Sequence, residues 1–591
     1  MSRARISQGA VVVSGLVLGA AALGACGDDR SGFENRKTTF EVDAGMDAPP
    51  ECKVQCSLDG RSVIDTCTGQ VVQKCSEDLA CGAGACIEPC AAAAADRSSN
   101  GCDFYFQTPR FDYTFPTNCY AAFVVNTSLK PATISLELEG KPLDLSKSTF
   151  RTTPGSADLV PHEGAIAPGE SVIVFVADRD PSAPPDPGVF GVDYRVACPG
   201  AVVPATYADE VPNGTGLGSS FHLSTNVPVA ATTIYPFGGA DSYLPTATLL
   251  LPVPAWGKEH MIVNAWSVGF TGAASAQIVA AEDDTKVTIL PKRAIQDGSG
   301  VRGGPAGAPL EYRLAKGQFL QLMQGEELTG SIVSSDKPTT TVGGHACAFV
   351  PSWGTCDILA QQIPAYEQWG SEYVGVGYRS RLGNEHEPVL YRVVAARDGT
   401  RLDYDPAIPA GAPVTLSAGE SAIFEAGTGD AFIVRTQDAE HPVYLGAYMT
   451  GGTRYSNRGD PEFVNVVPAG QYLSSYTFYA DPTYDETSLV VVRAKTNGAF
   501  EDVWLECAGV LTGWKPVGTR GEYEWLRVDL QRNGGPGETF GTSVCQAGLQ
   551  RMKSEGAFTA TVWGVALAAS YAVPGGMAQR KLVDVPLAPV N

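Results

Sequence analysis

Four residues whose side chains could do chemistry lie close together near the middle of the chain: His345, Cys347, Cys356 and Asp357. A cysteine thiolate beside a histidine base is the arrangement of a nucleophilic active site, and it requires a reduced thiol. Two cysteines so close in the sequence of an exported chain are instead expected to form a disulfide. We therefore expect a structural role for His345.

The other polar motifs predict no catalytic or metal centre. His162-Glu163 and His386-Glu387 each lack the second histidine of a zinc protease helix, and no nucleophile elbow, phosphate-binding loop or dinucleotide fingerprint is present, so no cofactor is expected. A glycosidase needs two carboxylates across a cleft. The acidic clusters are instead expected in exposed turns without the calcium-loop spacing, at Glu282-Asp283-Asp284 and at Asp481 with Asp485-Glu486.

The first residues predict export and a lipid anchor. Arg3 and Arg5 precede a short apolar run that ends in Leu23-Gly24-Ala25-Cys26, which is typical of a secretory signal peptide over residues 1–25. This ending resembles the lipobox of bacterial lipoproteins, a likeness that implies lipidation of Cys26. The alternative is an ordinary signal peptide with an unmodified Cys26. Fifteen cysteines are an odd number, and setting Cys26 aside leaves a set that can pair completely.

Residues 26–51 are polar and without periodicity, which predicts a flexible tether. No other segment is apolar enough to span a bilayer, so the membrane would be reached through the lipid alone. Gly27, in place of Asp, resembles the export-permitting case of the enteric sorting rule. We expect a position in the bacterial envelope, at the outer membrane and exposed at the surface.

A cysteine-rich module is expected over residues 52–98, followed by the body over residues 99–591. Such a short piece buries too little apolar area to fold unaided, which favours disulfides over zinc in an oxidising compartment. The alanine run Ala91–Ala95 is interpreted as a hinge. The spacing does not decide how the following residues pair: Cys52, Cys56, Cys67, Cys75, Cys81, Cys86, Cys90 and Cys102.

Composition predicts an all-β body. Short β-branched and aromatic runs alternate with turn residues, and the chain contains 66 Gly and 41 Pro. A net charge of −22 argues against binding nucleic acid or anionic lipid through charge. The cysteines of the body suggest the pairs Cys347 with Cys356, Cys119 with Cys198, and Cys507 with Cys545.

A loose internal repeat divides the body. Strand-like segments that carry Pro228, Pro338 and Pro442 recur roughly 100 residues apart, which is the size of a β-sandwich. We expect four related units near residues 103–258, 259–370, 371–473 and 474–591. Periodicity favours repeated antiparallel sandwich-like modules, but it leaves open one fused or propeller-like body.

The middle of the chain resembles the IgGFc-binding protein N-terminal domain family, which occurs in an animal mucus protein and in many bacterial surface proteins. The likeness covers roughly Cys102 to the C-terminus. The matching pieces are Ser335-Asp336-Lys337-Pro338, Gly344-His345 with Cys347, Pro351 and Cys356-Asp357, Gln362 with Pro364, Trp369-Gly370 with Tyr373, and Gly459-Asp460-Pro461 through Gln471-Tyr472 and Ser474–Phe478. The family name implies binding of immunoglobulin Fc, which the likeness alone does not establish for this chain.

The expected function is therefore non-enzymatic: a lipid-anchored surface protein whose β-rich body binds a protein or glycan ligand. A polysaccharide hydrolase or a purely structural envelope component are the alternatives. Trp353, Tyr366, Trp369 and Tyr373 could line a ligand groove, although core packing is the commoner role of such residues. Arg458-Gly459-Asp460 spells an integrin-binding tripeptide, for which we expect a turn instead.

The lipid anchor gives a direct test. Cys26→Ser is expected to abolish incorporation of a labelled fatty acid and to move the protein from the membrane pellet to the soluble fraction, because the thiol that carries the acyl chains is gone. Gly27→Ser keeps that thiol and is the matched control. A labelled, membrane-bound Cys26→Ser protein would show that the anchor lies elsewhere.

Overall fold

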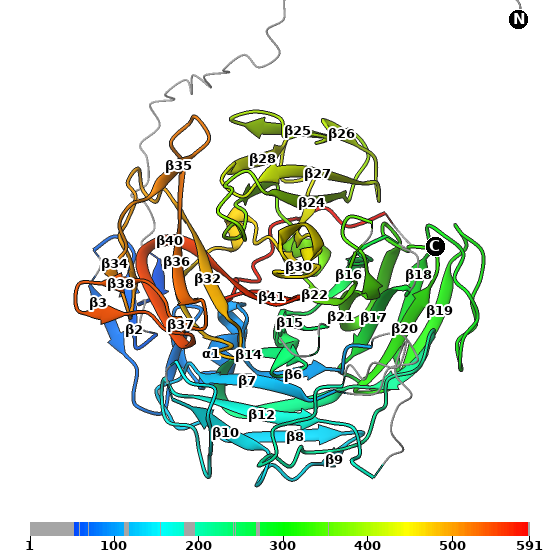
Figure 1. Cartoon of the computed structure of the whole chain (residues 1–591), viewed down its shortest axis with the longest axis horizontal. Coiled ribbons are helices and arrows are strands. Elements are labelled where there is room, and N and C mark those ends of the chain that lie inside the picture. Colours follow the sequence, from blue (N-terminus) through cyan, green and yellow to red (C-terminus); the bar gives the residue numbers. More distant parts are fainter. Residues whose placement is uncertain are drawn as a thin grey trace, which may run out of the picture. The chain divides into compact units, whose positions relative to one another are not determined.

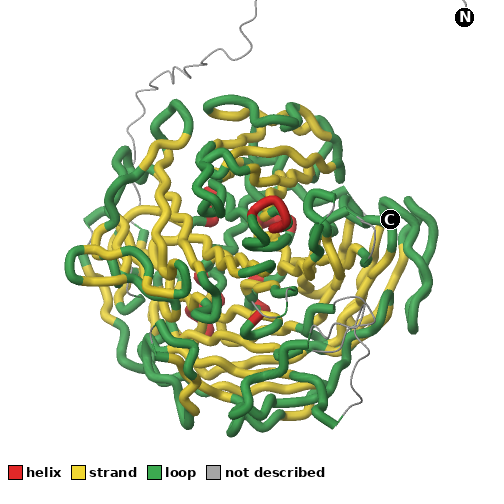
Figure 2. The backbone as a smooth tube through the Cα atoms, viewed as in Figure 1, coloured by secondary structure: helices red, strands yellow, loops and turns green. Residues whose placement is uncertain are grey.

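The computed structural model describes residues 53–588 apart from 58–59, 69, 111–117, 154, 183–194, 240–241, 243, 268–271 and 353. The signal peptide, the tether, Cys26, Cys52 and Trp353 lie outside these residues. Strands dominate the described chain, and helix is limited there to α1 (Pro89–Asp96) and short 3-10 turns (Figure 2). The all-β prediction is confirmed.

The cysteine-rich segment forms two small antiparallel sheets, one of β1 (Val54–Cys56), β2 (Ser62–Asp65) and β3 (Val71–Lys74), the other of β4 (Ala80–Gly82) and β5 (Ala85–Ile87). Few of its apolar side chains are buried, so covalent links hold it together. The bonds are Cys56–Cys81, Cys75–Cys86 and Cys90–Cys102, and Cys67 is also disulfide-bonded.

The hinge expected at Ala91–Ala95 is wrong, because these residues form helix α1. Alanine is the best helix former, and the Glu88 side chain accepts a hydrogen bond from the backbone N–H of Ala91 at 3.0 Å, which caps the first turn. Cys90 in this helix is bonded to Cys102 in the first strand of the body.

The body contains four strand sets with one pairing scheme, all antiparallel. A long strand runs through each set: β14 (Phe221–Tyr235), β21 (Ile332–Ala348), β28 (Phe432–Thr436) with β29 (Val443–Met449), and β40 (Gly548–Ala566). In the third set this strand is divided between Thr436 and Val443, whereas Pro228 and Pro338 lie inside the undivided strands β14 and β21. That set consequently has two four-stranded sheets, in the manner of a sandwich.

Three strands pair with the long strand near its start or along its length in every set. The first are β6 (Asn100–Phe106), β16 (Gly257–Met261), β23 (Glu372–Gly375) and β31 (Leu473–Ala480). The second are β7 (Tyr120–Asn126), β17 (Ala274–Ala280), β24 (Pro388–Ala395) and β32 (Glu486–Ala494). The third are β8 (Ile134–Leu138), β18 (Thr285–Leu290), β25 (Thr400–Asp405) and β33 (Val503–Leu505).

Outer strands extend these sheets away from the long strands. Those that pair with the second strands are β12 (Ser171–Ala177), β20 (Gln318–Gln324), β27 (Ser421–Gly427) and β36 (Tyr523–Arg532). The remainder are β9 (Lys141–Pro142), β10 (Thr149–Thr152), β11 (Leu159–Pro161), β13 (Gly216–Ser219), β19 (Leu310–Leu314), β26 (Thr415–Leu416), β34 (Gly509–Val510), β35 (Lys515–Val517) and β37 (Gly535–Pro536). Two further strands, β38 (Thr539–Phe540) and β39 (Ser543–Val544), pair with each other in a separate sheet.

A last strand returns along the end of each long strand: β15 (Thr246–Leu249), β22 (Asp357–Ile363), β30 (Glu462–Asn465) and β41 (Ala569–Pro574). These four central strands pack on one another, with β15 against β22 and β41, and β30 against the same two (Figure 1). Residues 53–591 form a single compact unit. Within this unit the four strand sets meet at the central strands.

One amide links the four central strands. Gln361 on β22 is fully buried, and its Nε2 donates hydrogen bonds to the carbonyl oxygens of Ala247 at 2.7 Å and Phe463 at 2.9 Å. The same nitrogen lies 3.4 Å from the carbonyl oxygen of Ala572. These acceptors belong to β15, β30 and β41, so a single side chain contacts all three other sets.

Further amides join neighbouring sets just after the central strands, in the 3-10 helices η2 (Val253–Ala255), η3 (Tyr366–Gln368) and η5 (Ala469–Gln471). Gln368 donates to the carbonyl oxygen of Ala255, and Gln471 donates to that of Gln368 at 3.0 Å. The two ends of the body meet where the Ser99 N–H donates to the carbonyl oxygen of Met577 at 2.8 Å. Backbone hydrogen bonds between the first and last segments thus close the assembly.

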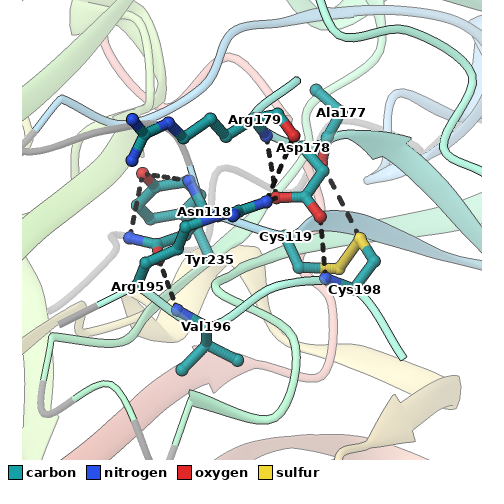
Figure 3. The surroundings of a disulfide bond; sticks show 9 residues. All are labelled: Asn118, Cys119, Ala177, Asp178, Arg179, Arg195, Val196, Cys198 and Tyr235. Atoms are coloured by element: carbon teal, nitrogen blue, oxygen red, sulfur yellow. Dashed lines mark hydrogen bonds and ion pairs between the residues drawn. A yellow bond between two sulfur atoms is a disulfide. The ribbon is translucent and has the colours of Figure 1, made fainter. Parts of the chain in front are cut away.

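Three disulfides lie in the body. Cys119–Cys198 ties the start of β7 to the segment after β12 (Figure 3). Around it, Asp178 accepts a hydrogen bond from the Cys198 N–H at 2.8 Å, and Asn118 accepts one from the Val196 N–H at 2.7 Å. The other two bonds are Cys347–Cys356 and Cys507–Cys545.

Replacing Gln361 tests how much its side-chain amide contributes to stability. Gln361→Leu keeps the side-chain volume but leaves three buried carbonyl oxygens without this donor, so the free energy of unfolding should fall by about 3 kcal/mol. Gln437→Leu removes a comparable amide that bonds Gly399 at the surface and should cost far less. Urea denaturation of both variants provides the measurement. Equal losses of unfolding free energy in the two variants would mean that the central hydrogen bonds stabilise the fold no more than a surface hydrogen bond does.

Candidate functional site

The cysteine–histidine pair singled out in the sequence is built into the core. Cys347 is disulfide-bonded to Cys356, so no free thiol lies beside His345. His345 is 1% exposed, and its Nδ1 accepts a hydrogen bond from the Cys347 N–H at 3.0 Å. Burial lowers the pKa of His345 to about 4, so the ring is neutral at pH 7. The arrangement braces the hairpin between β21 and β22.

Asp336, Lys337 and Pro338 lie within the long strand β21. Asp336 accepts a hydrogen bond from the Lys286 N–H at 2.9 Å, and the Lys337 ammonium donates to the carbonyl oxygen of Asp283. Both contacts hold the neighbouring hairpin of β17 and β18. These side chains connect strands and do not converge on a pocket.

Pro364, Trp369 and Gly370 lie at the joint between the second and third sets. The Trp369 indole donates to the carbonyl oxygen of Pro364 at 3.0 Å, and the Gly370 N–H donates to the Tyr373 hydroxyl at 3.0 Å. That hydroxyl donates in turn to the carbonyl oxygen of Val443 at 2.6 Å. With Tyr366, these aromatic side chains are buried, so they pack the core and line no groove.

Four carboxyl groups lie buried around the central strands: Asp357, Asp460, Glu462 and Asp481, each at most 1% exposed. Burial raises the pKa of Asp357 well above its usual range, and the nearby carboxyls of Asp460 and Glu462 raise it further. Burial likewise raises the pKa values of Asp460 and Glu462. All four groups are enclosed among packed strands, so the exposed turn expected for Asp481 is wrong.

No group of three or more His, Cys, Asp or Glu side chains is arranged to hold a metal ion in the part of the chain that the structure describes. The acidic cluster Glu282-Asp283-Asp284 lies in the turn between β17 and β18. There Asp283 accepts a hydrogen bond from the Lys316 N–H at 3.0 Å, and Asp284 forms an ion pair with Arg313. These acids organise a hairpin.

The Arg458-Gly459-Asp460 tripeptide is not presented to solvent as a recognition loop. Asp460 is 1% exposed and accepts a hydrogen bond from the Thr355 hydroxyl. Arg458 forms an ion pair with Glu486 on β32. A receptor that needs a free carboxylate therefore cannot reach this one.

An open cavity with an apolar wall lies between the third and fourth strand sets, and we name it the Trp525 cleft. Its volume is about 590 Å³. The uncharged segment 406–410 forms one wall, with Ile408 59% exposed. The remaining lining includes His386, Pro388, Asp430, Phe432, Pro516, Gly518 and Trp525.

A polar clamp fixes the two walls of the cleft. The Asp405 carboxylate accepts hydrogen bonds from the backbone N–H and the hydroxyl of Thr519, each at 2.9 Å, and Arg520 pairs with Asp403 at 3.2 Å. Gly518 has φ +68°, and a Cβ there would lie 2.4 Å from the Asp405 carboxylate. Glycine is thus required at the closest approach of the walls.

Charges surround the apolar part of the cleft. His386 Nδ1 lies 2.9 Å from Asp430 Oδ2, and this hydrogen bond raises the pKa of His386. The Trp525 ring is 3% exposed, with the Lys515 ammonium and the Arg527 guanidinium each 4.8 Å from its centre. An apolar floor with a charged rim is an arrangement that can hold a ligand.

Sequence reasoning missed Gln361 and every residue of the Trp525 cleft. The one available signal was the run from Pro406 to Pro413, which contains no charge in an acidic chain. Trp525 and Ile408 are too far apart in the sequence for any pattern to join them.

Asp481 makes stability depend on pH. Burial raises its pKa to about 6, so the folded state holds this proton more tightly than the unfolded chain. Its contribution is complete below the unfolded value of 3.8 and is lost as the pH rises to about 6, a loss of about 3 kcal/mol.

Asp481→Asn should therefore remove that loss. The difference in unfolding free energy between variant and wild type should shift in favour of the variant from pH 4 to pH 6.5, as followed by urea denaturation at each pH. Asp485→Asn, at an exposed acid of the same turn, is the control. Its difference in unfolding free energy from the wild type should not change with pH. A flat profile for Asp481→Asn would refute the assignment.

Residues 246–564 match the model of the family described as IgGFc binding protein. The match begins at β15 and ends within β40, so it includes the second and third strand sets, most of the fourth, and the buried carboxyl groups. No curated protein sequence matches the chain. Since the matched residues make up more than half of the chain, the protein belongs to the IgGFc-binding protein family.

Proposed function

We propose that this protein is a non-enzymatic binding protein, held at the bacterial cell surface by a lipid on Cys26, which takes a protein ligand in the Trp525 cleft. The observation that carries the proposal is the cleft itself. It joins an exposed apolar wall, a rigid floor and a charged rim. Family membership supports a β-rich binding body.

The cleft suits a polypeptide. Ile408 projects from a wall of small apolar residues and prolines, and Trp525 lies at the floor. Apolar and aromatic anchors of this kind dominate protein recognition, while rim charges such as His386 and Asp430 set orientation. The Asp405–Thr519 clamp holds the walls before binding, which reduces the entropy that binding costs.

The roles of the reactive side chains support a non-enzymatic protein. The cysteine nearest to His345 is bonded to another cysteine, and the buried carboxyls are enclosed among the central strands. A hydrolase of the kind considered from the sequence would place two carboxyls in an open cleft. Two acids, Glu425 and Asp430, do line the Trp525 cleft, but the Asp430 carboxylate is paired with His386, so the two are not a pair of free carboxyls.

Six disulfides connect described residues, which fits an oxidising compartment outside the cytoplasm. Together with the lipobox-like ending at Cys26, they support the proposed position in the envelope. In the described part of the chain, no helix is long and apolar enough to cross a membrane.

Ligand binding is testable with the full chain immobilised against a panel of purified extracellular proteins that includes the Fc fragment of immunoglobulin G, mucin and collagen. We expect saturable binding of at least one protein. Ile408→Asp should weaken it at least tenfold, because a charge replaces an apolar anchor.

Val510→Asp is the matched control, since Val510 is 49% exposed on β34 and does not line the cleft. It should bind as the wild type does. Binding that survives Ile408→Asp would place the site elsewhere, and binding of no protein in the panel would count against a protein ligand.

A further inference from the structure

A second pocket lies at the outer edge of the first strand set, away from the Trp525 cleft. It has a volume of about 300 Å³, at the lower end of the range for small-molecule sites. Strands β8 and β10 flank it, and both lie far from the central strands in Figure 1. Its walls include Ile134, Leu145 and Ile166, with Ser146, Thr149 and His162 among the polar residues.

His162 is the distinctive group of this pocket. The residue is 8% exposed, and its Nε2 is buried without a hydrogen-bond partner. The backbone is fixed, because the His162 N–H donates to the carbonyl oxygen of Thr149 at 2.9 Å. A buried ring nitrogen without a partner costs free energy that a ligand hydroxyl would recover.

The charge state of His162 sets the kind of ligand. Burial, and then the charge of Arg151, lower its pKa, against smaller opposing effects of Glu170 and the Gly164 backbone. At pH 7 the ring is therefore neutral. A neutral ring has one donor nitrogen and one acceptor nitrogen, and a sugar hydroxyl can bond to either. An uncharged ring provides no ionic attraction for an anion.

The aliphatic walls of this pocket also restrict the kind of ligand that fits. Ile134 and Leu145 present aliphatic surface that would cover one face of a ligand, and the hydroxyl-bearing Ser146 and Thr149 stand beside them. A sugar ring has both features, since one face carries C–H groups and the edge carries hydroxyls. A pocket of this volume has room for one ring.

We propose that this pocket binds a single neutral sugar ring, with one hydroxyl donating to Nε2 of His162 and the C–H face packed on Ile134 and Leu145. The site is separate from the Trp525 cleft and does not depend on a protein ligand there. The body would thus recognise a glycan at one edge of the first set.

Saturation-transfer NMR and calorimetry on the full chain test this with methyl glycosides of glucose, galactose, mannose and N-acetylglucosamine as probes, and glucuronic acid as the charged counterpart. At least one neutral glycoside should receive saturation, and the acid should receive none. His162→Leu should weaken binding about fivefold to tenfold through loss of the acceptor, whereas His162→Gln keeps an acceptor and should lose less.

Ile134→Trp should abolish binding by filling the pocket. Leu129→Trp, at a 52% exposed leucine outside it, is the matched control and should bind normally. Ile408→Asp should leave sugar binding unchanged, so that failure of the Trp525 cleft and failure of this site are distinguishable. Absence of saturation with every neutral glycoside, or equal binding by Ile134→Trp, would overturn the proposal.

Discussion

The hydrogen bonds that one buried amide makes to three other strands are the constraint on which this body depends. Gln361 contacts the carbonyl oxygens of Ala247, Phe463 and Ala572, and each acceptor belongs to a different strand set. Carbonyl groups buried where four sheets meet cannot reach water, and they need donors from within the protein. The central amide meets that need and fixes the register of all four central strands together.

The same region also contains buried acids. Asp357, Asp460 and Glu462 are enclosed there, and burial raises the pKa values of all three well above their usual range. A raised pKa favours the protonated form, which can both donate and accept hydrogen bonds among backbone groups. The residues that resemble an active site in sequence thus stabilise a core, and the Cys347–Cys356 bond closes the hairpin beside them.

The two proposed binding sites lie outside this shared centre. The Trp525 cleft uses the segment 406–410 and the turn at Gly518, and the His162 pocket uses β8 and segments between it and β12. Connections such as these can change without disturbing the central strands. The scaffold alone therefore does not specify a ligand, and the family name does not identify the ligand of this member.

The sequence by itself determined the all-β class, because short β-branched runs and turn residues act locally. Local spacing also pointed to a pair such as Cys347 with Cys356, and prolines such as Pro338 marked the recurring long strand. Tertiary structure alone decided that the strand sets fuse around Gln361, that Ala91–Ala95 form a capped helix tied to the body by Cys90, and that Ile408 meets Trp525 across a cleft. The physical reason is that these contacts join residues distant in the chain, or depend on burial, neither of which leaves a periodic signal in one sequence.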